Sequence, residues 1–287
     1  MLRLLGRQRT ATSTEARPHT EPYFMESPTE GDRLEAKTDA LTVGRHLLMT
    51  GLRQGMRALD VACGSGAVTR VMAKIAGQGM ATGVDLSQSR LDQARSRAAS
   101  DHLEIEFVCG KAQALPFADA TFDYVHARML FQYLEQPENV LDEMIRVTKP
   151  GGRVVLIDLD GQLNQLYPQP SAVSEDLNEA LRLLGEQGFD PSVGRKLLTM
   201  CTRAGLTSLR TWVEPYQVYQ NGHLTPADLS NWREKLLTAT RFLAAKTGEA
   251  RRWEDFREAY LSALTADNAF YYSSVIIVSG QVSSVPI

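Results

Sequence analysis

Short apolar runs alternate with amphipathic stretches along most of this chain. From residue 57 onward the runs are rich in Val, Ile and Leu, as in strands that are buried on both faces of a parallel sheet. Between them, apolar residues recur at the spacing of helices that pack one face on a core. The pattern predicts an α/β fold with a doubly wound, mostly parallel sheet of seven strands. The expected strands are residues 57–62, 81–86, 103–109, 122–127, 153–159, 206–219 and 270–282.

Helices are expected on both sides of the parallel strands. Stretches at 66–76 and 87–99 have helical spacing, and a further helix begins at Pro137, because proline suits the first turn of a helix. That helix is expected to stop at Pro150-Gly151-Gly152, where proline cannot continue it and glycine allows the turn.

The last third of the chain predicts an antiparallel strand pair and a helical cap. Between the two long final strands, Thr225 can cap a helix that starts at Pro226, and a second helix follows. An excursion at 161–192, with a helical stretch at 176–188, and a helix at 32–50 are expected to join this cap. The aromatic residues of the cap are expected to be mostly core: Trp232, Trp253, Phe256 and Tyr260. The expected division is a disordered tail (1–20), an N-terminal helix with the ligand-binding core (21–160), a cap insertion (161–192), more core (193–221), a helical cap insertion (222–268), and the last strand with its tail (269–287).

A glycine-rich turn joins the first expected strand to the helix after it. The segment reads Leu59-Asp60-Val61-Ala62-Cys63-Gly64-Ser65-Gly66. Gly64 and Gly66 allow a tight turn and a close approach of the backbone to a ligand. The N-terminus of the next helix offers N–H groups and partial positive charge, which suits a carboxylate or a phosphate. By itself, such a turn fits a dinucleotide equally well.

Three further residues narrow the choice of ligand. Asp85 closes the second strand, 19 residues after Gly66, where an acid accepts hydrogen bonds from ribose hydroxyls. Thr69 stands where a dinucleotide fingerprint has its third glycine. The Asp60 carboxylate would repel a pyrophosphate and attract an ammonium group. The segment therefore favours a nucleoside that carries an amino acid, with Leu86 covering one face of the base.

With these residues the chain resembles the class I S-adenosylmethionine-dependent methyltransferases, whose sheet is Rossmann-like, and in particular their small-molecule branch of the ubiquinone and menaquinone type. The resemblance covers about residues 20–160 by motif and the final strand pair by architecture. It rests further on residues 110–117 (GKAQALPF), 122–125 (FDYV) and 146–152 (RVTKPGG). It implies S-adenosylmethionine as the cofactor, with the methionine part held by Asp60, Gly64, Ser65 and Gly66, the ribose by Asp85, and the adenine by residues 110–117.

One position departs from the family pattern. The usual adenine-contacting aspartate is Lys111 here, which offers no hydrogen-bond acceptor. The Ala112 N–H and the Gln113 side chain are then expected to serve the adenine. Two more residues join the expected cofactor site. Tyr23 lies in a stretch that resembles the family's entry helix, and Arg128 follows the fourth strand; cap packing and pairing with an acid are their respective alternatives.

Methyl transfer requires little from the protein beyond placement, because the sulfonium is already a strong electrophile. A general base helps when the acceptor is a hydroxyl or an acidic carbon. Asp160 after the fifth strand and His223 at the start of the cap are the catalytic candidates, and both are expected at the rim of an acceptor pocket. A solvated turn is the alternative for Asp160. His126 fits a packed core histidine better than a catalytic one.

Composition and charge limit the partners. The first 20 residues carry four arginines against one glutamate, a net of +3, which leaves −6 on the rest of a chain whose formal charge is −3. No basic field therefore favours nucleic acid or an anionic membrane. Cys63, Cys109 and Cys201 form no C-x-x-C pair, so no metal is expected and a reducing cytoplasm fits. The expected partner is a small, apolar or aromatic acceptor, and a homodimer stays open.

Three other interpretations remain. The same fold and cofactor site could serve a cyclisation or a decarboxylation, because fold alone does not determine the reaction. A nucleic-acid methyltransferase is a second alternative, which the acidic body disfavours. An oxidoreductase that uses NAD(P) is the third, and the missing third glycine together with Asp60 counts against it.

Overall fold

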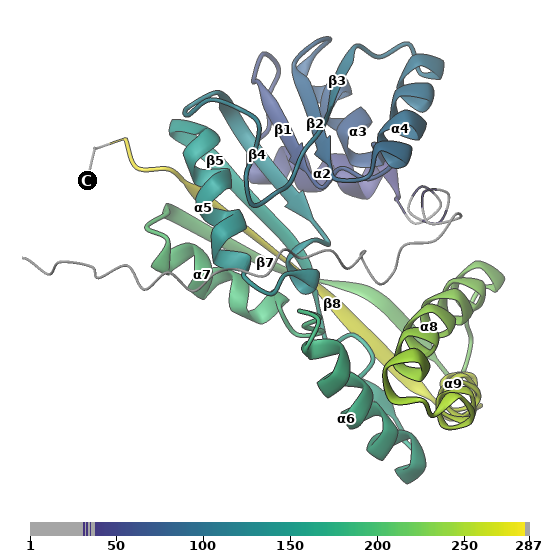
Figure 1. Cartoon of the computed structure of the whole chain (residues 1–287). Coiled ribbons are helices and arrows are strands. Elements are labelled where there is room, and N and C mark those ends of the chain that lie inside the picture. Colours follow the sequence, from purple (N-terminus) through teal and green to yellow (C-terminus); the bar gives the residue numbers. More distant parts are fainter. Residues whose placement is uncertain (1–30, 32, 34, 36–37, 285–287) are drawn as a thin grey trace, which may run out of the picture.

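Five parallel strands form the centre of one sheet, and three antiparallel strands continue it (Figure 1). The computed structural model describes residues 31, 33, 35 and 38–284. The strand order is β3-β2-β1-β4-β5-β8-β6, and β7 pairs with β8 outside that path. The strands are β1 (Ala58–Val61), β2 (Ala81–Asp85), β3 (Ile105–Cys109), β4 (Phe122–Arg128), β5 (Thr148–Asp160), β6 (Leu166–Tyr167), β7 (Thr207–Gln220) and β8 (Phe270–Gln281). The helices are α2 (Ala40–Thr50), α3 (Ala67–Ala76), α4 (Gln88–Ser100), α5 (Pro137–Val147), α6 (Ser171–Gly185), α7 (Leu197–Arg203), α8 (Pro226–Thr247) and α9 (Ala250–Leu264), with 3-10 turns η1 (Phe131–Tyr133) and η2 (Gly194–Lys196).

The doubly wound, mostly parallel sheet with an antiparallel C-terminal pair is confirmed, with one additional strand and an earlier end of the helix that begins at Pro137. An eighth strand, β6, pairs two residues of the 161–192 excursion with the start of β8. The helix expected to reach Pro150 ends at Val147, and Pro150-Gly151-Gly152 lies within β5. The reason is pairing, because Thr148 is already in register with Phe122 and the Gly151 N–H donates to Val282 O at 2.9 Å.

The helix expected at 32–50 is interrupted. Thr38 and Asp39 are not helical, and α2 begins at Ala40. Asp39 is the cause, since its carboxylate accepts a hydrogen bond from the Thr42 N–H at 2.9 Å and so caps α2. The short side chain of an N-cap residue starts a new helix here instead of continuing one.

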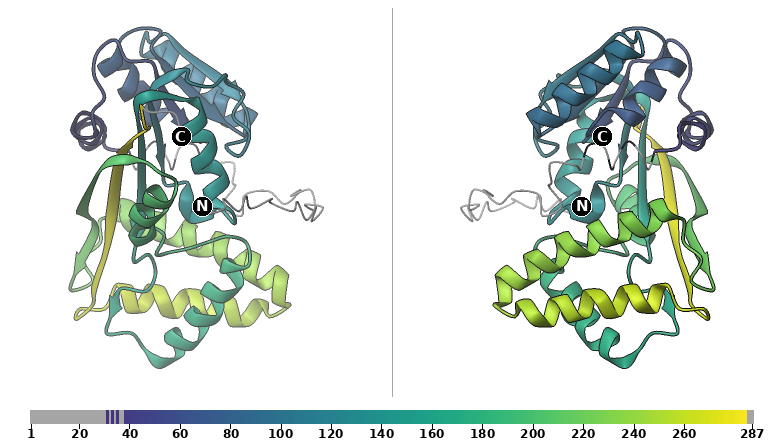
Figure 2. Two further views of the ribbon diagram at one scale, coloured as in Figure 1. Left: turned by 90° about the vertical axis from the view of Figure 1, so that its left-hand side faces the viewer. Right: turned by 90° about the vertical axis from the view of Figure 1, so that its right-hand side faces the viewer.

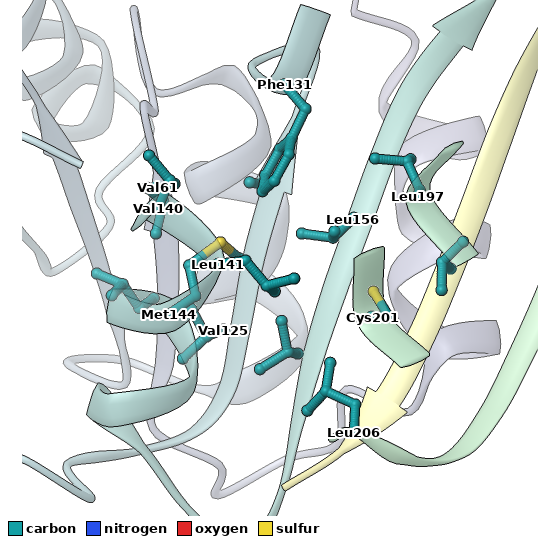
Figure 3. Packing of buried hydrophobic residues seen from close by; sticks show 14 of the residues in the cluster. Val61, Val125, Phe131, Val140, Leu141, Met144, Leu156, Leu197, Cys201 and Leu206 are labelled. Atoms are coloured by element: carbon teal, nitrogen blue, oxygen red, sulfur yellow. The ribbon is translucent and has the colours of Figure 1, made fainter. Parts of the chain in front are cut away.

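Helices bury both faces of the sheet. α2 and α3 pack on one face through Val43, Leu47 and Met72. On the other face, Figure 3 shows α5 and α7 packing on β4 and β5 through a second cluster of apolar side chains. Burial of this kind contributes about 25 cal/mol per Å² of apolar surface, so the two clusters hold the parallel strands rigidly. The rigid strands in turn fix the positions of the loops at their ends.

The cap helices gather beyond the end of β5, around the extended ends of β7 and β8 (Figure 2). α6, α8 and α9 share a third apolar cluster with these strand ends. Tyr271 of β8 stacks on Tyr219 with ring centroids 5.6 Å apart and meets Trp232 of α8 edge-on at 5.2 Å. The four aromatic residues expected in the cap core, Trp232, Trp253, Phe256 and Tyr260, are all buried.

Ionic contacts join α2 to β7. Both nitrogens of the Arg45 fork donate to Glu214, at 2.6 and 2.5 Å, and His46 Nε2 lies 3.0 Å from the same carboxylate. These bonds, led by the one from Arg45, lower the pKa of Glu214 to about 2. Burial lowers the pKa of His46. Glu214 therefore stays ionised at neutral pH and holds the edge strand to the helix that precedes the parallel sheet.

Candidate functional site

The residues singled out from the sequence meet at one edge of the sheet. Strands β1, β2, β3 and β4 are parallel neighbours, so their carboxyl ends and the loops that follow lie side by side (Figure 1). The strand order reverses between β1 and β4. In open α/β sheets, ligands bind outside the carboxyl ends of the strands at such a switch point.

Three residues of the glycine loop after β1 have a left-handed backbone, and the first of them is Ala62, with φ +58°. Gly64 has φ +54° and Gly66 has φ +77°. A Cβ on Gly66 would lie 2.9 Å from Ala94 Cβ, so the packing of α4 also requires glycine there. No side chain in the described part of the chain caps α3 at Gly66. The first N–H groups of α3 thus point toward the sheet edge without a capping partner, as in helix termini that bind anions.

Asp85 joins the end of β2 to this loop. Its Oδ2 accepts a hydrogen bond from the Gly64 N–H at 2.8 Å, and its Oδ1 accepts one from the Ser87 N–H at 2.9 Å. The Arg90 Nε lies 3.9 Å from Oδ1. A carboxylate offers about four acceptor positions, so two remain for the hydroxyls of a ribose.

Asp60 lies beneath the loop. The residue is 2% exposed, and its oxygens contact Thr69 Oγ1 at 2.7 Å and His126 Nδ1 at 3.2 Å. The sequence predicts a carboxylate near the loop that attracts an ammonium group. The geometry instead favours a positioning residue that ties α3 and β4 to the loop and adds negative charge below it. Thr69, which replaces a fingerprint glycine, supplies the hydroxyl for this bond, and His126 is the packed histidine that was expected.

The ends of β2 and β3 form an open apolar and polar surface. Leu86 is 65% exposed, which is unusual for leucine and leaves its side chain available to cover a flat ring. Lys111 and Gln113 are exposed beyond β3, and Ala112 between them is partly buried. Leu115 anchors this segment, because its N–H donates to Glu143 Oε2 at 2.7 Å. Asp85 pairs with Cys109, so Leu86 and the segment at 110–117 follow neighbouring strand ends.

Arg128 ends β4 next to the glycine loop. Val61 pairs with Ala127, so Arg128 lies opposite Ala62, the first residue of the loop. Its Nε is buried and has no hydrogen-bond partner among the described residues. A buried guanidinium N–H without a partner is costly unless a ligand satisfies it. Met129 follows with φ +57°, a strained conformation for methionine of the kind found at functional sites.

Sequence reasoning missed a buried polar group on the neighbouring strand. Asp158 of β5 is 1% exposed and accepts hydrogen bonds from the Leu159 N–H at 2.8 Å and the Gln132 N–H at 3.2 Å. Burial raises the pKa of Asp158 to about 7, although these backbone bonds oppose the rise. The position of Asp158 within an apolar run could have shown that this residue is buried. Its bond from the Gln132 N–H was not predictable, because Gln132 lies in the 3-10 turn η1, which the sequence pattern does not predict.

The raised pKa predicts a pH-dependent stability. Between about pH 4 and pH 7 the folded state keeps a proton on Asp158 that the unfolded state has released, so the free energy of unfolding falls as pH rises, by up to about 1.4 kcal/mol per unit. We expect urea unfolding to give the wild type a larger advantage over Asp158→Asn at about pH 5 than at about pH 8. The exposed Asp119→Asn variant should show no such trend. An equal difference at both pH values would contradict the assignment.

The two catalytic candidates are not brought together. Asp160 forms a bidentate pair with Arg195, with Nε and Nη2 both 2.8 Å from its oxygens, and so anchors η2. His223 is exposed in the turn after β7. Gln220 pairs with Phe270, whereas Asp160 pairs with Ser274, which places the turn about 13 Å farther along β8. Neither side chain is placed as a base at the sheet edge.

Other expectations concern parts that the structure covers incompletely. Tyr23 and the tail at 1–20 lie outside the described residues. Ser65 of the loop is buried and donates to Glu35 at 3.4 Å, so the segment before α2 reaches the loop. Within residues 31, 33, 35 and 38–284, no group of three His, Cys, Asp or Glu side chains could hold a metal ion. In the same residues, no helix is long and apolar enough to cross a membrane.

Known proteins share the sheet and its motifs. Residues 58–152 match the family described as a methyltransferase domain. A ubiquinone/menaquinone biosynthesis C-methyltransferase, UbiE of Roseobacter denitrificans, is 36% identical over 135 residues, which are 44% of this chain and 54% of that protein. The chain thus spans about half the length of the curated relatives it matches.

Two solved structures share the fold at low identity. The YcgJ protein of Bacillus subtilis has a TM-score of 0.57 at 19% identity and covers 85% of this chain and 99% of its own. The [4+2]-cyclase SpnF has a TM-score of 0.51 at 20% identity, with 85% and 82% covered. The glycine loop, Asp85 at the end of β2, and strands β1 to β4 lie within the matched segment. Residues 58–152 of this chain are therefore a methyltransferase domain of the class I, S-adenosylmethionine-dependent family.

Proposed function

We propose that this protein transfers a methyl group from S-adenosylmethionine to a small, apolar or aromatic acceptor, such as a quinone-like ring or another secondary metabolite. The observation that carries the proposal is the bond between the Gly64 N–H and Asp85 Oδ2, 2.8 Å long. It joins the loop suited to an amino acid with the acid suited to a ribose. The amino-acid part and the ribose of one nucleoside ligand would thus be bound by two groups that are hydrogen-bonded to each other.

The residues at the sheet edge fit this cofactor. The uncapped start of α3 and the buried, unpartnered Nε of Arg128 both suit the methionine carboxylate. Asp85 has acceptor capacity left for the ribose, and the exposed Leu86 offers an apolar surface for the adenine. Asp60 beneath the loop favours the positive charge of the ammonium and sulfonium groups.

When bound, the cofactor supplies an electrophilic methyl group, and the chain's task is placement. Gly64 and Asp85 hold one end of the ligand, and Arg128 fixes the carboxylate beside the end of β4. Among the residues that the structure describes, no side chain at this edge is placed as a general base. Asp158 is enclosed by backbone N–H groups of Leu159 and Gln132, so it orients η1 and does not reach an acceptor.

Calorimetry tests the cofactor assignment. We expect S-adenosylhomocysteine to bind in the micromolar range, about −8 kcal/mol, and NADH not to bind. A labelled methyl group should then appear on a hydroxylated aromatic acceptor. Binding of NADH without S-adenosylhomocysteine would refute the proposal and favour an oxidoreductase.

The alternative functions differ in the molecule, if any, that receives the labelled methyl group. A cyclase of this fold would convert its substrate without incorporating the methyl group, and the shared fold with SpnF keeps this possibility open. A nucleic-acid methyltransferase would label RNA or DNA, which the charge of the chain disfavours. A cytoplasmic location and a homodimer stay predictions.

A further inference from the structure

A network of hydrogen-bonded polar side chains, Lys235, Gln162 and Gln132, runs from the cap to the end of β4. Lys235 of α8 donates to Gln162 Oε1 at 2.5 Å, and Gln162 Nε2 donates to Gln132 Oε1 at 2.9 Å. Gln132 Nε2 in turn contacts the thioether sulfur of Met129 at 3.9 Å. This polar network therefore connects three segments that are far apart in the sequence. It ends at Met129, the strained residue that follows Arg128.

The side-chain amide of Gln132, at the end of this polar network, has only a weak hydrogen-bond acceptor. Gln132 and Gln162 are 2% and 1% exposed, so their amides have lost water. A thioether is a weak acceptor, and a buried amide N–H that meets only such a group costs free energy. An oxygen atom of a ligand would be a far better partner. Fold stability alone would be served as well by apolar residues here, which points to binding as the reason for this arrangement.

The face of α8 toward this polar network is polar and cationic. Asn231 lies one turn before Lys235 and accepts a hydrogen bond from Arg33 at 3.1 Å. The intervening Trp232 points into the cap core, and the Lys235 ammonium lies 5.2 Å from its ring centroid. The carboxylate of Asp158 accepts from the Gln132 backbone and not from its side chain. The side chains of this cluster thus include the cations of Arg33 and Lys235 and several amide groups.

A small cavity next to Lys235 does not explain the cluster. It measures about 30 Å³ and lies among α6, α8 and α9, with walls that are apolar apart from Lys235 and Tyr133. That volume holds one or two water molecules, whereas a benzene ring requires a cavity of roughly 150 Å³. The cavity is a packing gap within the cap and is too small for a ring-sized acceptor.

We propose that Lys235, Gln162 and Gln132 form the acceptor-recognition site, and that the acceptor carries an oxygen anion, as a carboxylate, phenolate or enolate does, on a flat apolar body. The inference rests on the proposed function. The anion binds the Lys235 ammonium, and the Gln132 amide donates to an oxygen of the same ligand. The body of the acceptor then lies against Met129, at the end of β4, because a thioether packs well on aromatic rings. The ionic contact with Lys235 then determines which acceptors the protein binds.

Binding of 2-naphthoate and its neutral isostere 2-naphthamide tests this proposal. With the protein saturated by S-adenosylhomocysteine, we expect 2-naphthoate to bind at least about tenfold tighter. Lys235→Met should bring the two affinities within about twofold of each other and leave the affinity for S-adenosylhomocysteine unchanged, which also reports an intact fold. Lys235→Arg should keep the preference. Lys246→Met, which removes another lysine of α8 that pairs with Glu186, is the matched control and should behave as wild type.

Two results would overturn the inference. One is a wild type that does not bind 2-naphthoate at millimolar concentration or does not prefer it. The other is a preference that survives Lys235→Met. Failure of the proposed function is distinct, because the protein would then not bind S-adenosylhomocysteine at all.

Discussion

Asp85→Ala is expected to weaken binding of S-adenosylhomocysteine by at least about 100-fold while the fold persists. Each hydrogen bond from a ribose hydroxyl to a carboxylate contributes about 1.5–3 kcal/mol, and two are lost. The variant also loses the acceptor of the Gly64 N–H, so the loop expected to hold the methionine part keeps only the backbone bond from the Cys63 N–H to Val84 O as its tie to β2. Both halves of the ligand site suffer from one substitution, which makes Asp85 the most sensitive position at this edge.

The control is Asp92→Ala, which removes an exposed acid of α4 that pairs with Arg95 and should leave the affinity unchanged. Asp85→Asn keeps one acceptor oxygen and should give an intermediate loss. Titration calorimetry measures the affinities, and circular dichroism verifies the fold. An Asp85→Ala protein with normal dichroism and unchanged affinity would mean that the ribose binds elsewhere.

The difference between what the sequence predicts and what it misses follows from distance along the chain. The glycine loop and Asp85 were predictable because each belongs to a strand end whose position follows from local pattern, and adjacent parallel strands bring such ends together. The Thr69 hydroxyl was visible as a departure from the fingerprint. Its bond to Asp60 required the register of α3 on β1, which no local pattern provides.

The acceptor side was not predictable in the same way. Gln162 and Lys235 are 73 residues apart, and their contact depends on how α8 lies on the segment after β5. Two glutamines in sequence look like solvated surface, because most glutamines are exposed. The position of His223 was not predictable for a related reason. A strand pattern gives the length of β7 but not how far β7 and β8 extend beyond the end of β5, and that extension carries His223 away from the sheet edge.

Trp253→Ala is expected to loosen the cap without changing the cofactor site. Trp253 is fully buried, its Nε1 donates to Thr247 Oγ1 at 2.9 Å, and its ring meets Phe256 edge-on at 6.0 Å. Truncation of such a residue costs about 3–5 kcal/mol. The cluster it belongs to joins α6, α8 and α9 and is distinct from the two clusters that hold the parallel strands. A loss confined to one cluster opens that region and leaves the others closed.

Hydrogen exchange measures this directly. Protection of amides in α8 and α9 should fall by about 100- to 1000-fold, whereas protection in β1 and β4 should change little. The affinity for S-adenosylhomocysteine should stay within about twofold. Met144→Ala is the matched control, because Met144 is equally buried in the cluster of Figure 3, between α5 and the parallel strands. That variant should lower the protection of amides in β4 and weaken the binding of S-adenosylhomocysteine. If Trp253→Ala lowers protection in β1 and β4 as much as in α9, and cofactor affinity falls with it, the cap and the sheet unfold as one unit. In that case the cap would support the cofactor site as well as the acceptor site.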